Sequence, residues 1–128
     1  MRLSFVIPVL NEAESLKQLY NEIKQNTVHH EVEIIFIDDG SRDDSFATME
    51  DLANQDKAVK VIKFRRNFGK AAALQQGFDL ASGEVIFTLD ADLQDDPIEI
   101  PQFLTKLDEG YDLVSGWKRK RLDPWHKR

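Results

Sequence analysis

The chain of 128 residues has no cysteine, no long apolar run and more acidic than basic side chains. The absence of cysteine excludes disulfide bonds and thiolate metal sites, and it is compatible with a reducing compartment. No apolar run approaches the ~20 residues of a membrane span, and no secretory signal pattern opens the sequence. A net charge of −6 argues against the broad basic surface of a nucleic-acid binder. We therefore expect a cytoplasmic protein without a nucleic-acid partner, with membrane association only through a region beyond this chain.

The glycine-rich phosphate loops of two large enzyme classes are also missing. The dinucleotide fingerprint G-x-G-x-x-G does not follow the first apolar segment, and the P-loop pattern G-x-x-x-x-G-K-[ST] does not occur. These absences argue against a nicotinamide-dependent dehydrogenase and against a P-loop enzyme.

Short apolar segments alternate with helical patterns along the chain, and 41% hydrophobic residues are enough for one domain over residues 1–128. The apolar segments predict strands at Leu3–Val9, Glu33–Ile37, Val59–Phe64, Glu84–Leu89 and Asp112–Ser115. Helical spacing predicts four helices, two that start at Asn11 and Ser41 and two that span Lys70–Leu80 and Ile98–Leu107. The alternation predicts an α/β fold with a mostly parallel sheet and helices on both faces.

Asn11 and Ser41 each precede a helical pattern at the distance of a helix cap. Glu14 stands three residues after Asn11, and Asp44 stands three residues after Ser41, as in a capping box. We predict capping roles for Asn11 and Ser41 in preference to ligand binding. Gly40 is predicted to supply a turn conformation that other residues avoid.

Two carboxylates, Asp90 and Asp92, close the fourth predicted strand. In open parallel sheets, ligands lie beyond the carboxyl ends of the strands, where the strand order reverses. For the strand order 3-2-1-4, that crevice lies between strands one and four. Carboxylates there are hard oxygen ligands through which Mg²⁺ or Mn²⁺ can bridge to a diphosphate. The alternative, that acidic residues merely solubilise a turn and cap the helix at Pro97, accounts for Asp95 and Asp96 but not for Asp90.

The first and second strands bring further carboxylates to the same edge of the sheet. Glu12 follows strand one, and Asp38 and Asp39 follow strand two. Clustered like charges cost stability unless a cation or hydrogen-bond donors occupy the gap. Asp38 can instead hold its own loop through backbone amides, and Glu12 suits the first turn of a helix equally well. The stronger functional candidates are therefore Asp39, Asp90 and Asp92.

A basic segment closes strand three and opens the third helix. Arg65, Arg66 and Lys70 offer positive charge there, and Gly69 permits close backbone approach. Positive charge beside a helix N-terminus suits a phosphate group. By itself this pattern is weak evidence for a phosphate site.

Five short motifs then occur in the order found in one enzyme family: 8–12 (PVLNE), 38–41 (DDGS), 67–70 (NFGK), 90–97 (DADLQDDP) and 116–118 (GWK). Together they resemble the successive motifs of family 2 inverting glycosyltransferases of the GT-A fold. The branch they resemble most is the dolichol-phosphate mannose synthase and bactoprenol glucosyltransferase group. The resemblance runs from Ser4 to Arg128 and implies the Rossmann-like nucleotide-binding half of a GT-A fold. It further implies metal-dependent transfer of a sugar from a UDP- or GDP-sugar, with a polyprenyl phosphate as a candidate acceptor.

The resemblance also carries residue roles to the matching positions of this chain. It implies a donor-nucleotide site made of Pro8, Leu10, Glu12, Asp39, Lys70, Asp90, Ala91, Asp92 and Lys118. It implies that Asp90, Asp92 and Gln94 bind the metal. Two positions depart from the family: tyrosine is usual where this chain has Leu10, and arginine is usual where it has Lys118. Lysine keeps the positive charge but loses the bidentate fork of arginine.

Members of the family have a catalytic region well beyond this length. The resemblance therefore implies an N-terminal fragment whose basic tail, residues 117–128, leads toward an acceptor-binding half. No residue is assigned as the catalytic base. Two hypotheses stay open, an active glycosyltransferase and a donor-binding module without turnover. A fragment also exposes apolar surface, which favours a homo-oligomer.

A phospho-receiver domain is a third possibility from a different class, because it also gathers acidic residues at the strand ends of a doubly wound sheet. It needs a phospho-accepting aspartate at the end of strand three. Strand three here ends in Phe64, Arg65 and Arg66, which argues against a receiver domain.

Overall fold

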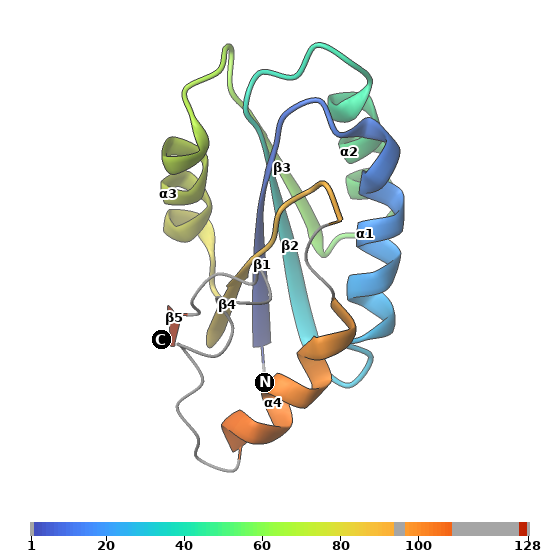
Figure 1. The fold of residues 1–128 in the computed structure, drawn as a ribbon, viewed down its shortest axis with the longest axis vertical. Helices are drawn as coiled ribbons and strands as arrows, with labels where there is room; N and C mark the ends of the chain where they lie inside the picture. The colour runs from blue at the N-terminus through green and yellow to red at the C-terminus, as the bar shows by residue number, and fades with distance from the viewer. Residues whose placement is uncertain (1, 94–96, 109–125, 128) are drawn as a thin grey trace.

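The computed structural model of the chain describes residues 2–93, 97–108 and 126–127. The order of elements is β1 (Arg2–Val9), α1 (Ala13–Gln25), β2 (Glu31–Asp38), α2 (Ser45–Gln55), β3 (Val59–Lys63), α3 (Lys70–Leu80), β4 (Val85–Thr88), the 3-10 turn η1 (Pro97–Glu99), α4 (Ile100–Asp108) and β5 (His126–Lys127). Strands and helices alternate, as the apolar segments predict (Figure 1).

The sheet has the order β3-β2-β1-β4-β5. Strands β1 to β4 are parallel, which confirms the predicted order 3-2-1-4 and the mostly parallel sheet. Strand β5 pairs antiparallel with β4 through Val85↔Lys127 and Ile86↔His126. No pattern in the sequence predicts β5, and the strand predicted at Asp112–Ser115 lies outside the described residues.

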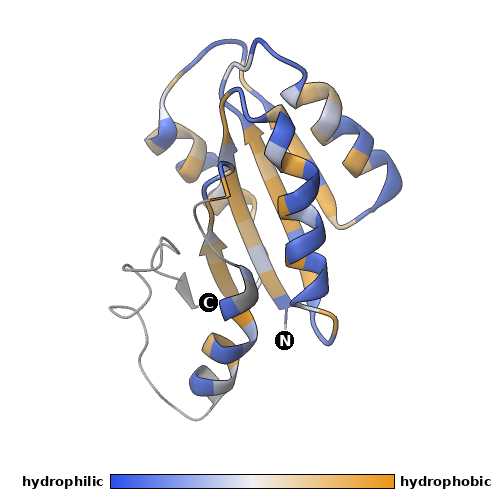
Figure 2. Ribbon diagram, turned by 45° about the vertical axis from the view of Figure 1, so that its right-hand side comes forward, coloured by the Kyte–Doolittle hydropathy of each residue, from blue (hydrophilic) through white to orange (hydrophobic). Residues whose placement is uncertain are grey.

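Helices cover both faces of the sheet, as predicted. The helices α1, α2 and α4 pack on one face, and α3 packs on the other (Figure 1). The apolar residues form one core on each face of the sheet. Successive side chains of β1 point to opposite faces, so Phe5 packs into the core beneath α1, α2 and α4, and Val6 packs into the core beneath α3. The Phe87 ring stacks on Phe5 at 5.1 Å between centroids and meets the Phe103 ring edge-on at 5.5 Å. Figure 2 shows the apolar residues along the strands between these layers.

Both predicted helix caps are wrong. Helix α1 begins at Ala13 after Glu12, and α2 begins at Ser45 after Asp44, with no side-chain capping bond at either residue. Asn11 instead has a left-handed φ of 56°, and its Oδ1 accepts a hydrogen bond from the Arg42 amide at 2.8 Å. The Ser41 hydroxyl accepts from the Asn11 amide at 2.9 Å. The two polar side chains therefore join the β1–α1 and β2–α2 loops to each other.

The fourth helical segment starts differently from the prediction. Pro97–Glu99 form a 3-10 turn, and the α-helix follows over Ile100–Asp108 instead of Ile98–Leu107.

Among the described residues, every helix is too short or too polar to cross a membrane.

A buried carboxylate, Glu33, links the amino ends of β1, β2 and β3 to the loop that precedes β4. Glu33, with 1% of its side chain exposed, accepts hydrogen bonds from Ser4 Oγ at 2.5 Å, Lys60 Nζ at 2.8 Å and Ser82 Oγ at 3.0 Å. Burial by itself raises the pKa of Glu33. The hydrogen bonds from Lys60, Ser4 and Ser82 outweigh that effect and lower the pKa to about 2. Glu33 is therefore a structural carboxylate on the edge opposite the predicted site.

Candidate functional site

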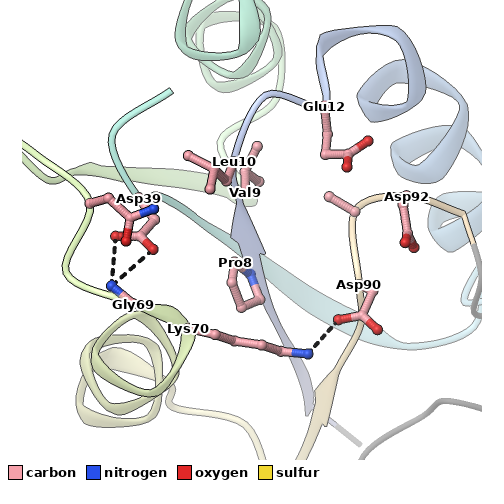
Figure 3. Close-up of a pocket in the computed structure, with 11 residues that line it drawn as sticks. Pro8, Val9, Leu10, Glu12, Asp39, Gly69, Lys70, Asp90 and Asp92 are labelled. Atoms are coloured by element: carbon pink, nitrogen blue, oxygen red, sulfur yellow. Dashed lines mark hydrogen bonds and ion pairs between the residues drawn. The ribbon is translucent and has the colours of Figure 1, made fainter. Parts of the chain in front are cut away.

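A pocket of about 390 Å³ opens at the carboxyl ends of the strands, between β1 and β4 and beside β2. The loops after all four parallel strands contribute to it (Figure 3). It is lined by Pro8, Val9, Leu10, Glu12, Asp39, Asn67, Gly69, Lys70, Asp90, Ala91 and Asp92. The crevice predicted where the strand order reverses is therefore present in the structure.

Almost all residues predicted for the donor site come together in this pocket. The lining contains Pro8, Leu10, Glu12, Asp39, Lys70, Asp90, Ala91 and Asp92. Lys118 and Gln94 lie outside the described residues. The lining also contains Val9, Asn67 and Gly69, which belong to the sequence motifs but not to the predicted donor set. Their position inside the 8–12 and 67–70 motifs was the only signal in the sequence that could have pointed to them.

Lys70 and Asp90 form an ion pair at the rim of the pocket. The Lys70 Nζ lies 2.7 Å from Asp90 Oδ1 (Figure 3), and 56% of the Lys70 side chain and 31% of the Asp90 side chain are exposed. Lys70 is the first residue of α3, while Asp90 follows β4. The pair therefore places an ammonium group and a carboxylate side by side, both partly exposed, at the rim of the pocket.

Asp39 is almost fully buried and holds the neighbouring loop. Its carboxylate accepts a hydrogen bond from the Phe68 amide at 2.7 Å. It also accepts one from the Gly69 amide at 3.1 Å (Figure 3). Gly69 has a φ of 102°, which is open to glycine and strained for other residues. Asp39 thus fixes the β3–α3 loop, from which Lys70 extends, against the end of β2.

Asp38 and Gly40 shape the same region. The Oδ1 atom of Asp38 accepts from the Ser41 amide at 2.8 Å, so Asp38 holds its own loop as the sequence analysis allows. Gly40 has a φ of 87°, which confirms the predicted turn conformation. A Cβ atom at Gly40 would lie 2.7 Å from the carbonyl carbon of Arg66 and from the amide nitrogen of Asn67. Only glycine lets the two loops approach this closely.

Negative charge collects around Glu12, where the pocket meets the start of α1. Burial raises the pKa of Glu12, and the carboxylates of Asp92, Asp43 and Glu14 raise it further. The Ser15 hydroxyl of α1 donates a hydrogen bond to the Ala91 carbonyl, which ties the segment between Asp90 and Asp92 to the helix. A cation bound beside Asp92 would offset this repulsion.

The carboxylates of Asp90 and Asp92 are oxygen ligands that fit a hard divalent cation, provided that a bound ligand completes the coordination shell of the cation. Within residues 2–93 and the other described segments, no group of three or more carboxylate or histidine side chains forms a ready-made metal cluster. Mg²⁺ in phosphate-transfer sites usually takes only one or two carboxylates and completes its shell with phosphate oxygens and water. Asp90 and Asp92 would supply that number, and the third predicted ligand, Gln94, lies outside the described residues.

Comparison with solved structures defines the class. S. aureus TarS (residues 1–349), solved with UDP-GlcNAc, superposes with a TM-score of 0.66 and 25% identity, covering 85% of this chain and 32% of that one. A mannosyltransferase from Pyrobaculum calidifontis, solved with GDP-Man and Mn²⁺, gives a TM-score of 0.64 and 22% identity over 70% of this chain and 27% of that one. The fold is the Rossmann-like unit of GT-A glycosyltransferases.

The sequence comparison gives the family. Residues 4–128 match the family model described as Glycosyl transferase family 2, and the chain belongs to that family. It is 42% identical to the undecaprenyl-phosphate 4-deoxy-4-formamido-L-arabinose transferase of Proteus mirabilis (strain HI4320) over 99% of this chain. The chain spans 40% of the length of that relative.

Proposed function

We propose that this chain is the donor-binding domain of a metal-dependent inverting glycosyltransferase, formed by residues 1–128 as one unit. The observation that carries the proposal is the pocket at the carboxyl edge, where Asp90 and Asp92 lie beside Lys70 and Asp39. Its donor is a UDP- or GDP-sugar, and its cofactor is Mg²⁺ or Mn²⁺.

The diphosphate of the donor would lie along the β4 side of the pocket. Asp90 and Asp92, with Gln94, are the residues that would hold the metal, and Lys70 would neutralise a phosphate oxygen. When bound, the metal supplies Lewis-acid stabilisation of the leaving nucleoside diphosphate. The existing contact between Lys70 and Asp90 supports this assignment, because it shows that the ammonium reaches the carboxylate edge.

The nucleoside would lie on the opposite side, over the end of β1 and beside Asp39. Pro8 and Leu10 offer apolar contact to a flat base, and 41% of the Leu10 residue is exposed. Leucine cannot stack as an aromatic ring does, so base binding depends more on Asp39 and on the backbone around it. Glu12 completes the pocket on the side of α1.

The acceptor proposed for the whole protein is a polyprenyl phosphate at the cytoplasmic face of a membrane. The support is the name of the Proteus relative, which acts on undecaprenyl phosphate. The basic tail, residues 117–128 with Lys118, suits an anionic lipid phosphate by its charge.

Donor binding without turnover is the second candidate function for this chain. It is favoured by one observation, that the chain spans only 40% of the length of its Proteus relative. A sugar-transfer and donor-hydrolysis assay, with and without Mn²⁺, separates the two candidates. Turnover by the chain alone supports the first, and tight binding without turnover supports the second.

Calorimetric titration tests the donor site itself. The chain is titrated with UDP, GDP, UDP-glucose and GDP-mannose, each with Mn²⁺ and with EDTA. The titrations are repeated on Asp92→Ala and on Asp51→Ala, which removes an exposed carboxylate of α2. We expect metal-dependent binding of one nucleotide class, lost in Asp92→Ala and kept in Asp51→Ala. Binding that is indifferent to Mn²⁺ and to Asp92 would refute the metal site.

A further inference from the structure

A second pocket of about 600 Å³ lies beside the donor pocket, and the two share Leu10 and Asn67 in their walls. Its lining comes from the last residue of β3 and from the loops after β1, β2 and β3. It includes the cationic residues Arg42, Lys63, Arg65 and Arg66. No aspartate or glutamate is among its described lining residues. We call this hollow the basic pocket. It concentrates four cations in a chain whose net charge is −6.

The four cations have no acidic partner in the part of the chain that the structure describes. None of them forms an ion pair there, and all four residues are exposed. Arg66 lies over the Phe68 ring at 4.6 Å, and Lys63 lies over the Phe46 ring at 4.4 Å. Contacts with ring faces hold a cation in place without neutralising it. The charges in the basic pocket are therefore available to an anion.

The backbone around the basic pocket is fixed before any ligand arrives. Gly40 allows the loop that carries Arg42 to lie directly against the backbone of Arg66. The Arg42 amide is held by Asn11 Oδ1 at 2.8 Å. The Phe68 amide, two residues after Arg66, is held by Asp39 at 2.7 Å. A pocket whose walls are already ordered loses less entropy when it binds a ligand.

The neighbouring donor pocket has the opposite character. It contains the four carboxylates Glu12, Asp39, Asp90 and Asp92 and the single cation Lys70. Without a metal, that pocket repels an anion, whereas the basic pocket attracts one. Arginine forks bind phosphate oxygens in pairs, which favours phosphate among the possible anions.

We propose that the basic pocket is a second, metal-independent binding site for a phosphate-bearing ligand, separate from the site of the donor diphosphate. Its ligand class is an oligophosphate or a group of clustered phosphate esters, held chiefly by Arg42, Arg65 and Arg66. The proposal does not depend on the proposed donor site, because it requires neither Asp92 nor a metal.

The test uses inorganic pyrophosphate with the ¹⁵N-labelled chain in EDTA. Arg65→Gln/Arg66→Gln removes two charges from the basic pocket, and Lys17→Gln/Lys57→Gln removes two charges from exposed positions outside it. Each of the two removed guanidinium groups would donate charge-assisted hydrogen bonds to the phosphate oxygens. We therefore expect the first variant to bind at least about tenfold more weakly and the second to bind within about twofold of wild type.

Amide shifts of the wild-type chain locate the ligand without relying on any variant. The proposal requires the largest shifts in residues 40–42 and 63–67 and small ones in residues 88–92. The absence of saturable binding, or the largest shifts at residues 88–92, would overturn it. So would equal weakening by both double variants.

A parallel experiment distinguishes the source of the phosphate. The chain is mixed with phosphatidylglycerol vesicles and with phosphatidylcholine vesicles. Binding to pyrophosphate but to neither vesicle supports a site for a small, soluble phosphate compound. Binding to pyrophosphate and to phosphatidylglycerol, both lost in Arg65→Gln/Arg66→Gln, supports a lipid headgroup as the source. Binding to phosphatidylglycerol vesicles without any binding of pyrophosphate overturns the pocket and indicates a membrane-facing surface instead.

Discussion

The Nζ atom of Lys70 lies 2.7 Å from Oδ1 of Asp90 across the rim of the candidate donor pocket. Lys70 is the first residue of α3, and Asp90, twenty positions later, follows the end of β4, so their contact joins the two elements. In the proposed donor complex, a phosphate oxygen would contact the ammonium and the metal would contact the carboxylate. Binding would then exchange one ion pair for two favourable contacts.

Lys70→Gln should weaken donor binding because the donor phosphate loses a charged hydrogen-bond donor. Such a bond contributes about 1.5–3 kcal/mol, which corresponds to an increase in Kd of about 10- to 100-fold. Calorimetric titration with the donor in the presence of Mn²⁺ measures this Kd. Lys57→Gln, at an exposed position outside the pocket, is the control. An unchanged Kd in Lys70→Gln would show that the ammonium does not reach the donor.

Gly40→Ala and Gly69→Ala should differ although both glycines have positive φ values of 87° and 102°. Backbone strain costs each variant about 1–3 kcal/mol. Only the alanine at position 40 also overlaps backbone atoms of Arg66 and Asn67, whereas a Cβ at position 69 meets no atom within 4 Å. We expect Gly40→Ala to lose clearly more unfolding free energy in urea. Equal losses would contradict the close approach of the two loops.

Gly77→Ala should destabilise the chain despite replacing glycine inside helix α3. The better helix propensity of alanine favours folding by about 1 kcal/mol. The new Cβ, however, would lie 2.2 Å from Cγ1 of Val6 and 3.0 Å from Cδ1 of Ile37. Overpacking of this kind costs about 1–3 kcal/mol, so the net change expected in urea unfolding is a loss of up to about 2 kcal/mol. Gln76→Ala, at an exposed position on the same helix, should change stability by less than about 0.5 kcal/mol.

Glu33→Gln should change how stability depends on pH. The pKa of Glu33 is lowered to about 2 from 4.5, so its charge stabilises the fold fully above pH 4.5 and loses this effect as pH falls toward 2. The shift corresponds to about 3 kcal/mol at neutral pH. Urea unfolding of the wild type and of Glu33→Gln is measured from pH 7 to pH 2. The difference in unfolding free energy between the two should be of about that size at pH 7 and should shrink below pH 4.5.

Glu31→Gln provides the control for this experiment. Arg2 forms ion pairs with both Glu33, at 3.3 Å, and Glu31, at 3.5 Å. Unlike Glu33, Glu31 has 79% of its side chain exposed. Its removal should cost less than about 1 kcal/mol. If the difference in unfolding free energy between wild type and Glu33→Gln stays constant with pH, Glu33 stabilises the fold by packing and not by charge.

Much of the fold is predictable because it follows from local patterns. Strand β4 is a short apolar run, and helix α3 matches its predicted bounds of Lys70 and Leu80. Strand β5 could not be found in this way, because two residues, His126 and Lys127, carry no pattern of their own. They become a strand only by pairing with β4.

The polar contacts of the loops were the least predictable part. Asn11 has the sequence context of a helix cap, yet its side chain bonds the amide of Arg42. Local capping and long-range bonding compete for the same side-chain oxygen, and the outcome depends on which amide lies near. Asp39 shows the same limit, because its acidity suggests ligand binding while its carboxylate also holds Gly69.

The sequence by itself determined that the motif carboxylates gather at one edge, since parallel strands joined by helices all end on the same side of the sheet. It therefore places Glu12, Asp39, Asp90 and Asp92 together without any coordinates. Only the tertiary structure decided which polar groups pair and that two pockets of opposite charge lie side by side. Those features depend on distances of a few ångströms between loops far apart in the chain, and no local pattern encodes such distances.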